Sequence, residues 1–393
     1  MMVLQAIVGV PPAGALTTAP DDTYMTNGKV YATALSEDGG TLYIGGKFNR
    51  VRENPPGVPG ISRSVSNVAA IDVATGAALR TWRPQVTGDG AVVRSLAVKD
   101  GRVFIGGNFT AVGGEPRKNL AAVDANTGAV SSFAPVVGGA TSYVYALQAS
   151  GSKLYAGGGF LSVDGLPRGN LAAFDLASGA LDPAWKPKTA GKVRALELDP
   201  ARTSIFVGGS FGSVTGSNGT EEARQSVARV YATTGNLHPW KIPSGTIQGP
   251  QTAWDLTATP TRLYGGFGAK PNYLAAFSLD LGNVGQQAWR FSTVGNVQTV
   301  ALSGNGSRLF FGGHFGIARL HQTVCGGKPL RGLASVNPAT GRINCDWLPS
   351  IEGPDPNYDG PWALTMTGVH LWVGGGFTGI SGLDQRNLAR FTL

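Results

Sequence analysis

The sequence predicts an all-β fold, a seven-bladed β-propeller with four-stranded blades. Three observations carry this prediction: a glycine-rich composition, a motif that recurs seven times, and short alternating segments between the motifs. The 393 residues include 59 Gly and 24 Pro and only 14% are charged, which disfavours long helices. Apolar residues occur in short runs, none of 18 or more, so no membrane insertion is expected. Because the repeat uses nearly the whole length, we expect a single domain over residues 1–393.

The recurring motif is an aromatic residue followed by a Gly pair and a Phe, as in LYIGGKF and VFIGGNF. It begins at Tyr43, Phe104, Tyr155, Phe206, Tyr264, Phe310 and Trp372. An alternating segment such as VRSLAV precedes each motif, and one such as NLAAVD follows it. After a turn of the ATG type comes a fourth segment with an aromatic residue near a Pro, except in unit five, where Trp289 has no Pro. Four strands in units of 46 to 62 residues are typical of propeller blades.

Two further features concern how the units join. The Gly pair fits a place where backbones approach so closely that a Cβ would collide. The last unit stops inside its third strand, at Leu393. We therefore expect the N-terminal strand, about residues 3–12, to complete the last blade and remove the open edges.

The pattern YxGGxFxxVxGxxRxNLAAxDxxTGxxxxWxP resembles the delta-60 type repeats of secreted actinobacterial propellers, and is similar to the extracellular repeats of a fungal cortical polarity marker. The resemblance covers nearly the whole chain and implies a propeller, without implying one activity. Units four and six depart from the pattern, with Ser226 and Gly332 in place of Asn, and Tyr231 and Asn337 in place of the Asp of units one to three. We expect any specialised surface on these two units.

The charge pattern bears on which partners the protein could bind, and the cysteine content bears on where it is located. The net charge is +8, but Lys and Arg are dispersed with no run of four, so no nucleic-acid partner is expected. Cys325 and Cys345 are too few for a zinc site and form either a disulfide or two buried thiols. The low Lys and Glu content suits an exported protein and favours the disulfide. We expect a secreted or cell-surface protein whose export signal is absent from this sequence, because the apolar N-terminus lacks a basic region.

A binding site is predicted at the mouth of the central channel. The second position of each opening strand carries a large amphipathic residue: Tyr31, Arg94, Tyr145, Arg194, Trp254, Gln298 and Trp362. Such residues dominate binding hot spots. The alternative is that they wedge between blades as core, although two arginines fit a dry core badly unless they are paired.

Four insertions should extend this site on the same face. They follow Phe48, Phe211 and Phe315 and precede Trp362, and long loops on one rim of a rigid scaffold often bind ligands. Neutral drift in exposed loops is the alternative. We add His321 and Tyr358, which lie in the last two insertions, to the candidate binding residues.

Two repeated residue types are assigned structural roles. One Arg recurs before the third strand, and a residue used once per blade usually solves a structural problem, here hydrogen bonding to loop carbonyls; its positions are Arg117, Arg168, Arg224, Arg331 and Arg386. The aspartates that open the TG or SG turns are expected to form those turns, at Asp72, Asp124 and Asp175.

Catalytic chemistry has little support. The four histidines lie on different units without metal-ligand spacing, so no metal or other cofactor is expected. The segment DPNYDG, residues 355–360, is rich in oxygen ligands and could hold Ca²⁺, but it lacks EF-hand spacing.

The sequence thus predicts a non-catalytic extracellular binding module for a glycan, a peptide or a partner protein. The first alternative is a hydrolase or lyase on polysaccharide that uses Asp255, beside the ring position Trp254, with acidic residues of the same face. The second is an architectural docking platform in a larger surface assembly.

Overall fold

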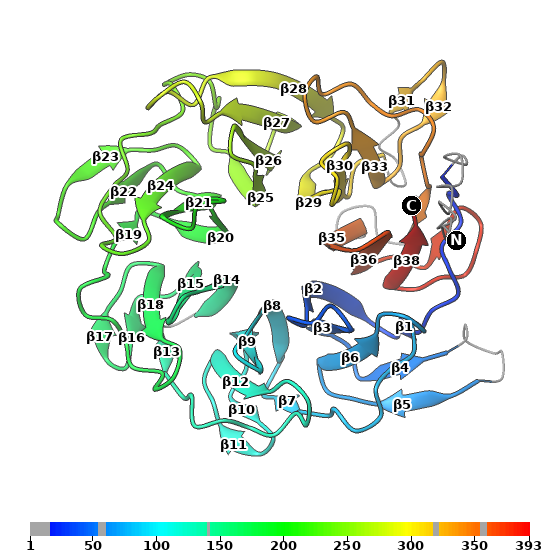
Figure 1. Ribbon diagram of the computed structural model, residues 1–393, viewed down its shortest axis with the longest axis horizontal. Helices are drawn as coiled ribbons and strands as arrows, with labels where there is room; N and C mark the ends of the chain where they lie inside the picture. Colours follow the sequence, from blue (N-terminus) through cyan, green and yellow to red (C-terminus); the bar gives the residue numbers. More distant parts are fainter. Residues whose placement is uncertain (1–15, 54–59, 140–141, 317–321, 354–359) are drawn as a thin grey trace, which may run out of the picture.

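The computed structural model describes residues 16–53, 60–139, 142–316, 322–353 and 360–393. Over these residues the chain is all-β, arranged as small antiparallel sheets around a centre (Figure 1). This confirms the predicted fold class, which is β-propeller-like. No helix in this part of the chain is long and apolar enough to cross a membrane.

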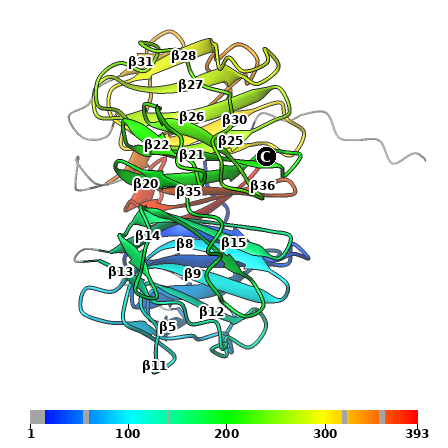
Figure 2. The same cartoon turned by 90° about the vertical axis from the view of Figure 1, so that its left-hand side faces the viewer.

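Each repeat unit supplies one radial sheet, and the sheets stand edge-on around the centre (Figures 1 and 2). The first strands are β2 (Lys29–Leu35), β8 (Val92–Lys99), β14 (Tyr143–Ser150), β20 (Lys192–Leu198), β25 (Thr252–Ala258), β29 (Val297–Leu302) and β35 (Gly360–Thr367). The second strands are β3 (Thr41–Lys47), β9 (Arg102–Asn108), β15 (Lys153–Gly159), β21 (Ser204–Ser210), β26 (Arg262–Gly268), β30 (Leu309–Gly313) and β36 (His370–Gly376). The third strands are β6 (Val68–Asp72), β12 (Leu120–Asp124), β18 (Leu171–Asp175), β24 (Val227–Tyr231), β27 (Asn272–Ser278), β33 (Leu333–Val336) and β38 (Leu388–Thr392).

The prediction of four strands in each sheet needs correction. Among the described residues only the fifth unit has a fourth ladder strand, β28 (Gln287–Thr293), which pairs with β27. In the second and third units the fourth segment is reduced to single bridges, Val123 to Val130 and Phe174 to Leu181. Unit five is also the unit without a Pro after its outer aromatic residue. Because Pro cannot donate to a ladder, this correlation explains why the other fourth segments do not extend into strands.

The loops between the second and third strands build a second set of small sheets at the periphery, in units with and without an insertion (Figure 1). In four units a hairpin between the second and third strands pairs with the segment before the first strand. These strands are β1 (Met25–Thr26), β4 (Arg50–Arg52) and β5 (Ser62–Ser64); β7 (Val86–Thr87), β10 (Ala111–Val112) and β11 (Glu115–Pro116); β13 (Val137–Gly138), β16 (Ser162–Val163) and β17 (Leu166–Pro167); and β19 (Lys188–Thr189), β22 (Ser213–Thr215) and β23 (Glu221–Ala223). The pairs β31 (Thr323–Val324) with β32 (Lys328–Pro329), and β34 (Ile351–Glu352) with β37 (Gly379–Ile380), complete the set.

The core lies between neighbouring radial sheets, and glycine allows their close approach. A Cβ on Gly157 would lie 2.5 Å from Val193 Cγ1 of the next sheet. The same contact joins the last sheet to the first, because a Cβ on Gly374 would lie 2.6 Å from Val30 Cγ1. Real Cβ atoms essentially never show such short contacts, so the first Gly of the motif makes room for a Val side chain of the next sheet. The close approach of backbones that the sequence predicted occurs at the second Gly, where a Cβ on Gly158 would collide with the Tyr143 carbonyl oxygen.

The two ends of the described chain meet at this junction (Figure 1). Asp21 N donates to Arg390 O of β38 at 2.7 Å, and the Arg390 guanidinium pairs with the Asp21 carboxylate at 2.8 Å. Trp347 Nε1 donates to Thr17 O at 2.9 Å. The strand expected over residues 3–12 lies outside the described residues, but the segment that follows it is bonded to the last sheet.

Candidate functional site

All seven large side chains singled out in the opening strands are β-bulge residues. In each first strand the register with the second strand skips one position, for example between Val193 and Ala195, and the skipped residue is the large one. These residues are Tyr31, Arg94, Tyr145, Arg194, Trp254, Gln298 and Trp362. A bulge leaves one residue unpaired in the ladder and changes the direction of its side chain. The same backbone feature therefore positions all seven large side chains.

Six of these residues form what we call the aromatic–arginine ring: Tyr31, Arg94, Tyr145, Arg194, Trp254 and Trp362. The Arg94 guanidinium carbon lies 3.9 Å from the Tyr31 ring centroid, and that of Arg194 lies 4.0 Å from Tyr145 and 5.0 Å from Trp254. Trp362 meets Tyr31 and Trp254 edge to face, with centroids 5.4 Å and 6.0 Å apart. These side chains are half-buried, which separates them from the fully buried blade core.

Gln298, the seventh bulge residue, is 4% exposed and so more buried than the six residues of the ring. It comes from β29, between the strands that carry Trp254 and Trp362. Its Oε1 atom has no hydrogen-bond partner.

The ring forms one end of a central cavity of about 480 Å³, which we call the channel cavity. All of its lining residues belong to first strands, and all seven first strands contribute to it. Below the ring the lining mixes apolar residues, such as Leu196, Leu256 and Met366, with polar ones; the polar residues include Ser95, Gln148, Thr257 and Thr299. Thr33 and Thr365 bridge the first and last strands with an Oγ1 to Oγ1 distance of 2.7 Å. No described residue of the insertions lines this cavity, so the predicted extension of the site by the insertions is not confirmed for the described residues.

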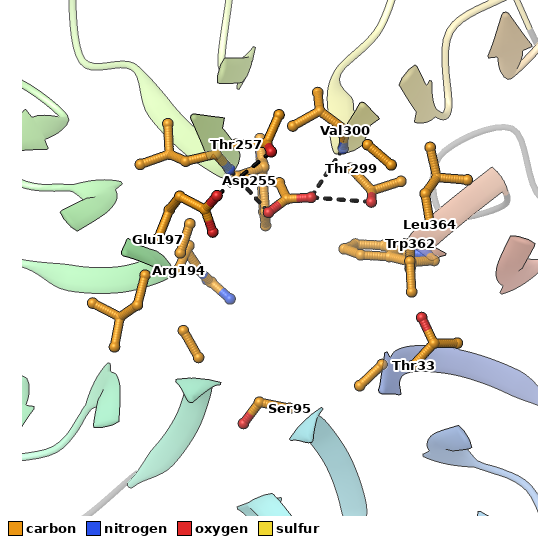
Figure 3. Close-up of a pocket in the computed structure, with 18 of the residues that line it drawn as sticks. Thr33, Ser95, Arg194, Glu197, Asp255, Thr257, Thr299, Val300, Trp362 and Leu364 are labelled. Carbon is orange, nitrogen blue, oxygen red and sulfur yellow. Dashed lines mark hydrogen bonds between the residues drawn. The ribbon is translucent and has the colours of Figure 1, made fainter. Parts of the chain in front are cut away.

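Asp255 faces this cavity one position after the bulge of β25 (Figure 3). Its carboxylate accepts hydrogen bonds from Leu256 N at 2.9 Å, Val300 N at 2.9 Å and Thr299 Oγ1 at 3.1 Å. Burial nevertheless raises its pKa to about 6, because desolvation outweighs these bonds.

Glu197 of β20 is a functional candidate that the sequence interpretation missed. Its carboxylate accepts from Ala258 N at 3.1 Å and from Gln148 Nε2 at 3.3 Å. Burial, and then the neighbouring Asp255 charge, raise its pKa to about 8. The two carboxyl groups face the same space in Figure 3. A sequence signal for Glu197 existed. It lies opposite the aromatic residue of the repeated motif, Phe206, and is the one charged residue at that position, since the other six first strands carry Ala, Gln or Thr there.

The ring arginines and these carboxyls do not neutralise each other. Within the described residues neither Arg94 nor Arg194 forms a salt bridge. Burial lowers the pKa of Arg194, and Tyr145 opposes this effect. The channel cavity therefore has guanidinium groups at one end and two carboxyl groups of raised pKa below them.

The other sequence candidates have different outcomes. His321 and Tyr358, with the predicted Ca²⁺ segment at 355–360 except for Gly360, lie outside the described residues. Across the described ranges no group of three or more His, Cys, Asp or Glu could hold a metal ion. The adjacent acidic residues Glu221 and Glu222, in the insertion of unit four, belong to the peripheral strand β23 and do not line the channel cavity.

The structural roles assigned to the repeated residues are confirmed for the turn aspartates and for Arg117 and Arg168, whereas Arg386 bonds the Asp384 carboxylate instead of loop carbonyls. Arg117 donates to the carbonyls of Pro116 and Ser131, both at 2.8 Å. Arg168 does the same with Pro167 at 2.8 Å and Asp182 at 3.2 Å. Asp124 accepts from the backbone and side chain of Thr127, and thus forms the predicted turn.

The disulfide between Cys325 and Cys345 is confirmed, with Cα atoms 5.6 Å apart. It joins the hairpin of the sixth unit to the segment that bears the buried Trp347.

Comparison with known proteins adds no family assignment. The chain matches no protein-family model, and no curated protein has a significantly similar sequence.

Proposed function

We propose that the chain is a secreted, seven-bladed β-propeller that binds a glycan at the aromatic–arginine ring. The observation that carries this proposal is the set of bulges, which repeats around the centre and presents stacking faces and guanidinium groups to one cavity. Seven radial sheets with contacts between the first and the last support the closed propeller. The disulfide supports an oxidising compartment.

A sugar suits this cavity better than a protein surface does. A volume of about 480 Å³ is in the range of small-molecule pockets. Sugar rings have apolar faces, which can stack on Trp and Tyr. Their hydroxyl groups can form hydrogen bonds with the Ser, Thr and Gln side chains of the cavity wall. A folded partner would contact the rim and leave the cavity unused.

The test is glycan-array screening followed by titration of each ligand found. Replacing Trp254 or Trp362 by Ala should weaken binding by roughly tenfold or more, as loss of a hot-spot aromatic does. Tyr231, an exposed aromatic residue on β24 outside the cavity, provides the control Tyr231→Ala. Unchanged affinity in both tryptophan variants would place the site elsewhere, and binding of peptides alone would refute the glycan assignment.

A second candidate function is cleavage of polysaccharide, favoured by the two carboxyl groups in the channel cavity. Two acids with raised and different pKa values, about 8 for Glu197 and about 6 for Asp255, are the usual arrangement of a general acid and a general base. Activity screening on cell-wall and plant polysaccharides separates the two functions. Turnover that Asp255→Asn or Glu197→Gln abolishes would support the enzyme, whereas turnover unchanged in both variants would exclude these residues.

A further inference from the structure

A second cavity lies in the fourth unit, one of the two that depart from the repeat. Its volume is about 630 Å³, and its walls come from the end of β21, the segment before β24 and residues 241–251. Ser226 lines it, where four other units have Asn. Because Ser is the smaller residue, this substitution leaves space at a position that Asn fills elsewhere. We call this space the fourth-unit cavity.

Arg224 lines the fourth-unit cavity and breaks the pattern of its repeat position. Arg117 and Arg168, its equivalents, are half-buried. In each of them Nη1 donates to one backbone carbonyl and Nη2 to another. Arg224 is only 4% exposed. It uses Nη1 alone, which donates to Glu222 at 2.7 Å and to Ala223 O at 3.2 Å.

Two donors of Arg224, Nε and Nη2, are buried without a partner, whereas in Arg117 and Arg168 only Nε is. Nε and Nη2 form one edge of the guanidinium, the edge that binds both oxygens of a carboxylate side by side. Leaving buried donors of a charged group unbonded costs a few kcal/mol. Gln251 adds an unpartnered acceptor in the same cavity, since its Oε1 is buried without a bond and the residue is 2% exposed.

The local charge balance leaves room for one anionic group. Glu222 pairs with Arg224 and lies 3.9 Å from Lys241 Nζ, so two cations share one carboxylate. Glu222 does not itself line the cavity, whereas Arg224 and Lys241 do. Apolar walls from Phe211 and Ile247 surround the charged end.

We propose that the fourth-unit cavity binds a small hydroxycarboxylate with an apolar body. Its carboxylate occupies the Nε–Nη2 edge of Arg224, its hydroxyl donates to Gln251 Oε1, and its apolar part packs on Phe211 and Ile247. The site is separate from the channel cavity and does not depend on the function proposed there.

Isothermal titration with mandelate, a hydroxycarboxylate with a phenyl ring, tests this proposal in the full chain. Mandelate should bind saturably, and mandelamide, the neutral analogue, at least tenfold more weakly. Arg224→Lys, which keeps the charge but loses the two-pronged edge, should weaken mandelate binding at least tenfold. Arg117→Lys at the equivalent position of unit two is the matched control and should stay within twofold of the wild type. Trp254→Ala should also leave mandelate binding unchanged.

Two results would overturn the proposal: mandelate binding no tighter than that of mandelamide, or equal losses in Arg224→Lys and Arg117→Lys. A crystal structure of the wild-type protein with mandelate gives a readout that needs no variant to fold. Density for the carboxylate on the Arg224 edge supports the site, and density elsewhere, or no density at saturating mandelate, refutes it.

Discussion

The second and third units differ instructively from the fourth and fifth. In the second and third, the repeated arginines Arg117 and Arg168 bond backbone carbonyls. The fourth unit carries Arg224 with its unbonded edge at the equivalent position, and the first strands of the fourth and fifth units carry the channel carboxyls Glu197 and Asp255. Residues that recur hold the scaffold together, and the residues for which we propose binding or catalytic roles are ones that break the recurrence.

The largest expected effect is the loss of stability when a buried tryptophan of the scaffold is removed. Trp185 is fully buried, and Trp185→Ala should lower the free energy of unfolding by about 3–5 kcal/mol, through lost burial and the cavity left behind. Trp254→Ala in the half-buried ring should cost clearly less. Urea unfolding measures both, with the exposed Leu161→Ala as control. Equal losses for the two tryptophans would mean that the ring is structural core.

The disulfide should give the next largest effect. Replacing Cys325 and Cys345 by Ser opens a loop with a sequence separation of 20 and should lower the free energy of unfolding by about 3 kcal/mol, through greater freedom of the unfolded chain. Urea unfolding of the oxidised protein and the double variant measures the loss. Thiol titration of the denatured, unreduced protein should find no free thiol, and two free thiols would contradict the bridge.

Much of this organisation could be predicted from the sequence, and the misses have physical causes. The Gly-Gly-Phe motif predicted the second strands, and the large residues at the second position of the opening strands predicted the ring. Both features recur once per unit, so they are visible in the sequence as a repeat. The bulges could not be predicted, since register depends on the pairing of two strands. Glu197 was missed because its raised pKa arises from burial and from Asp255 on the neighbouring strand.

Arg224 shows a second kind of limit. The repeat correctly predicted carbonyl bonding for Arg117 and Arg168, but the same residue type in unit four has a different acceptor within reach, Glu222. Whether a donor finds its acceptor depends on distances that a linear pattern does not contain. The departure at Ser226 drew attention to unit four, but nothing in the repeat pattern singled out Arg224 there.

The channel carboxyls should make stability depend on pH. Their folded-state pKa values, about 8 and about 6, lie above the ordinary 4.5 and 3.8, so the folded protein binds more protons than the unfolded chain between these limits. The stabilisation is complete below about pH 4 and is lost as the pH rises through 6 and then 8. Between pH 6.5 and pH 9, the free energy of unfolding of the wild type should fall by on the order of 2 kcal/mol more than that of the double variant Glu197→Gln, Asp255→Asn.

The control for this pH profile is Asp124→Asn. The Thr127 hydrogen bonds hold the pKa of this turn carboxyl below its usual value, so its contribution is lost only at acid pH. Urea unfolding over the same pH range should show the wild-type slope in this control. The opposite result, a wild-type slope in the Glu197 and Asp255 double variant, would mean that both carboxyls titrate normally.

The smallest expected effect tests whether the departure at Ser226 sacrifices stability. Ser226 has a positive φ of 63°, a region that Asn tolerates better, and its one side-chain bond goes to Gln251 O at 2.9 Å. Asn119, its equivalent in unit two, donates to Val137 O at 2.9 Å and accepts from Phe109 N at 3.2 Å. Ser226→Asn should therefore stabilise the protein by about 0.5–1 kcal/mol in urea unfolding.

The same substitution should reduce the space in the fourth-unit cavity, and so weaken mandelate binding while the fold gains stability. The reverse change in unit two, Asn119→Ser, should destabilise by about 1 kcal/mol, since it removes hydrogen bonds without creating a ligand site. If Ser226→Asn instead lowers stability, then unit four has adjusted its backbone to Ser, and the comparison between regular and departing units would no longer explain why Ser stands there.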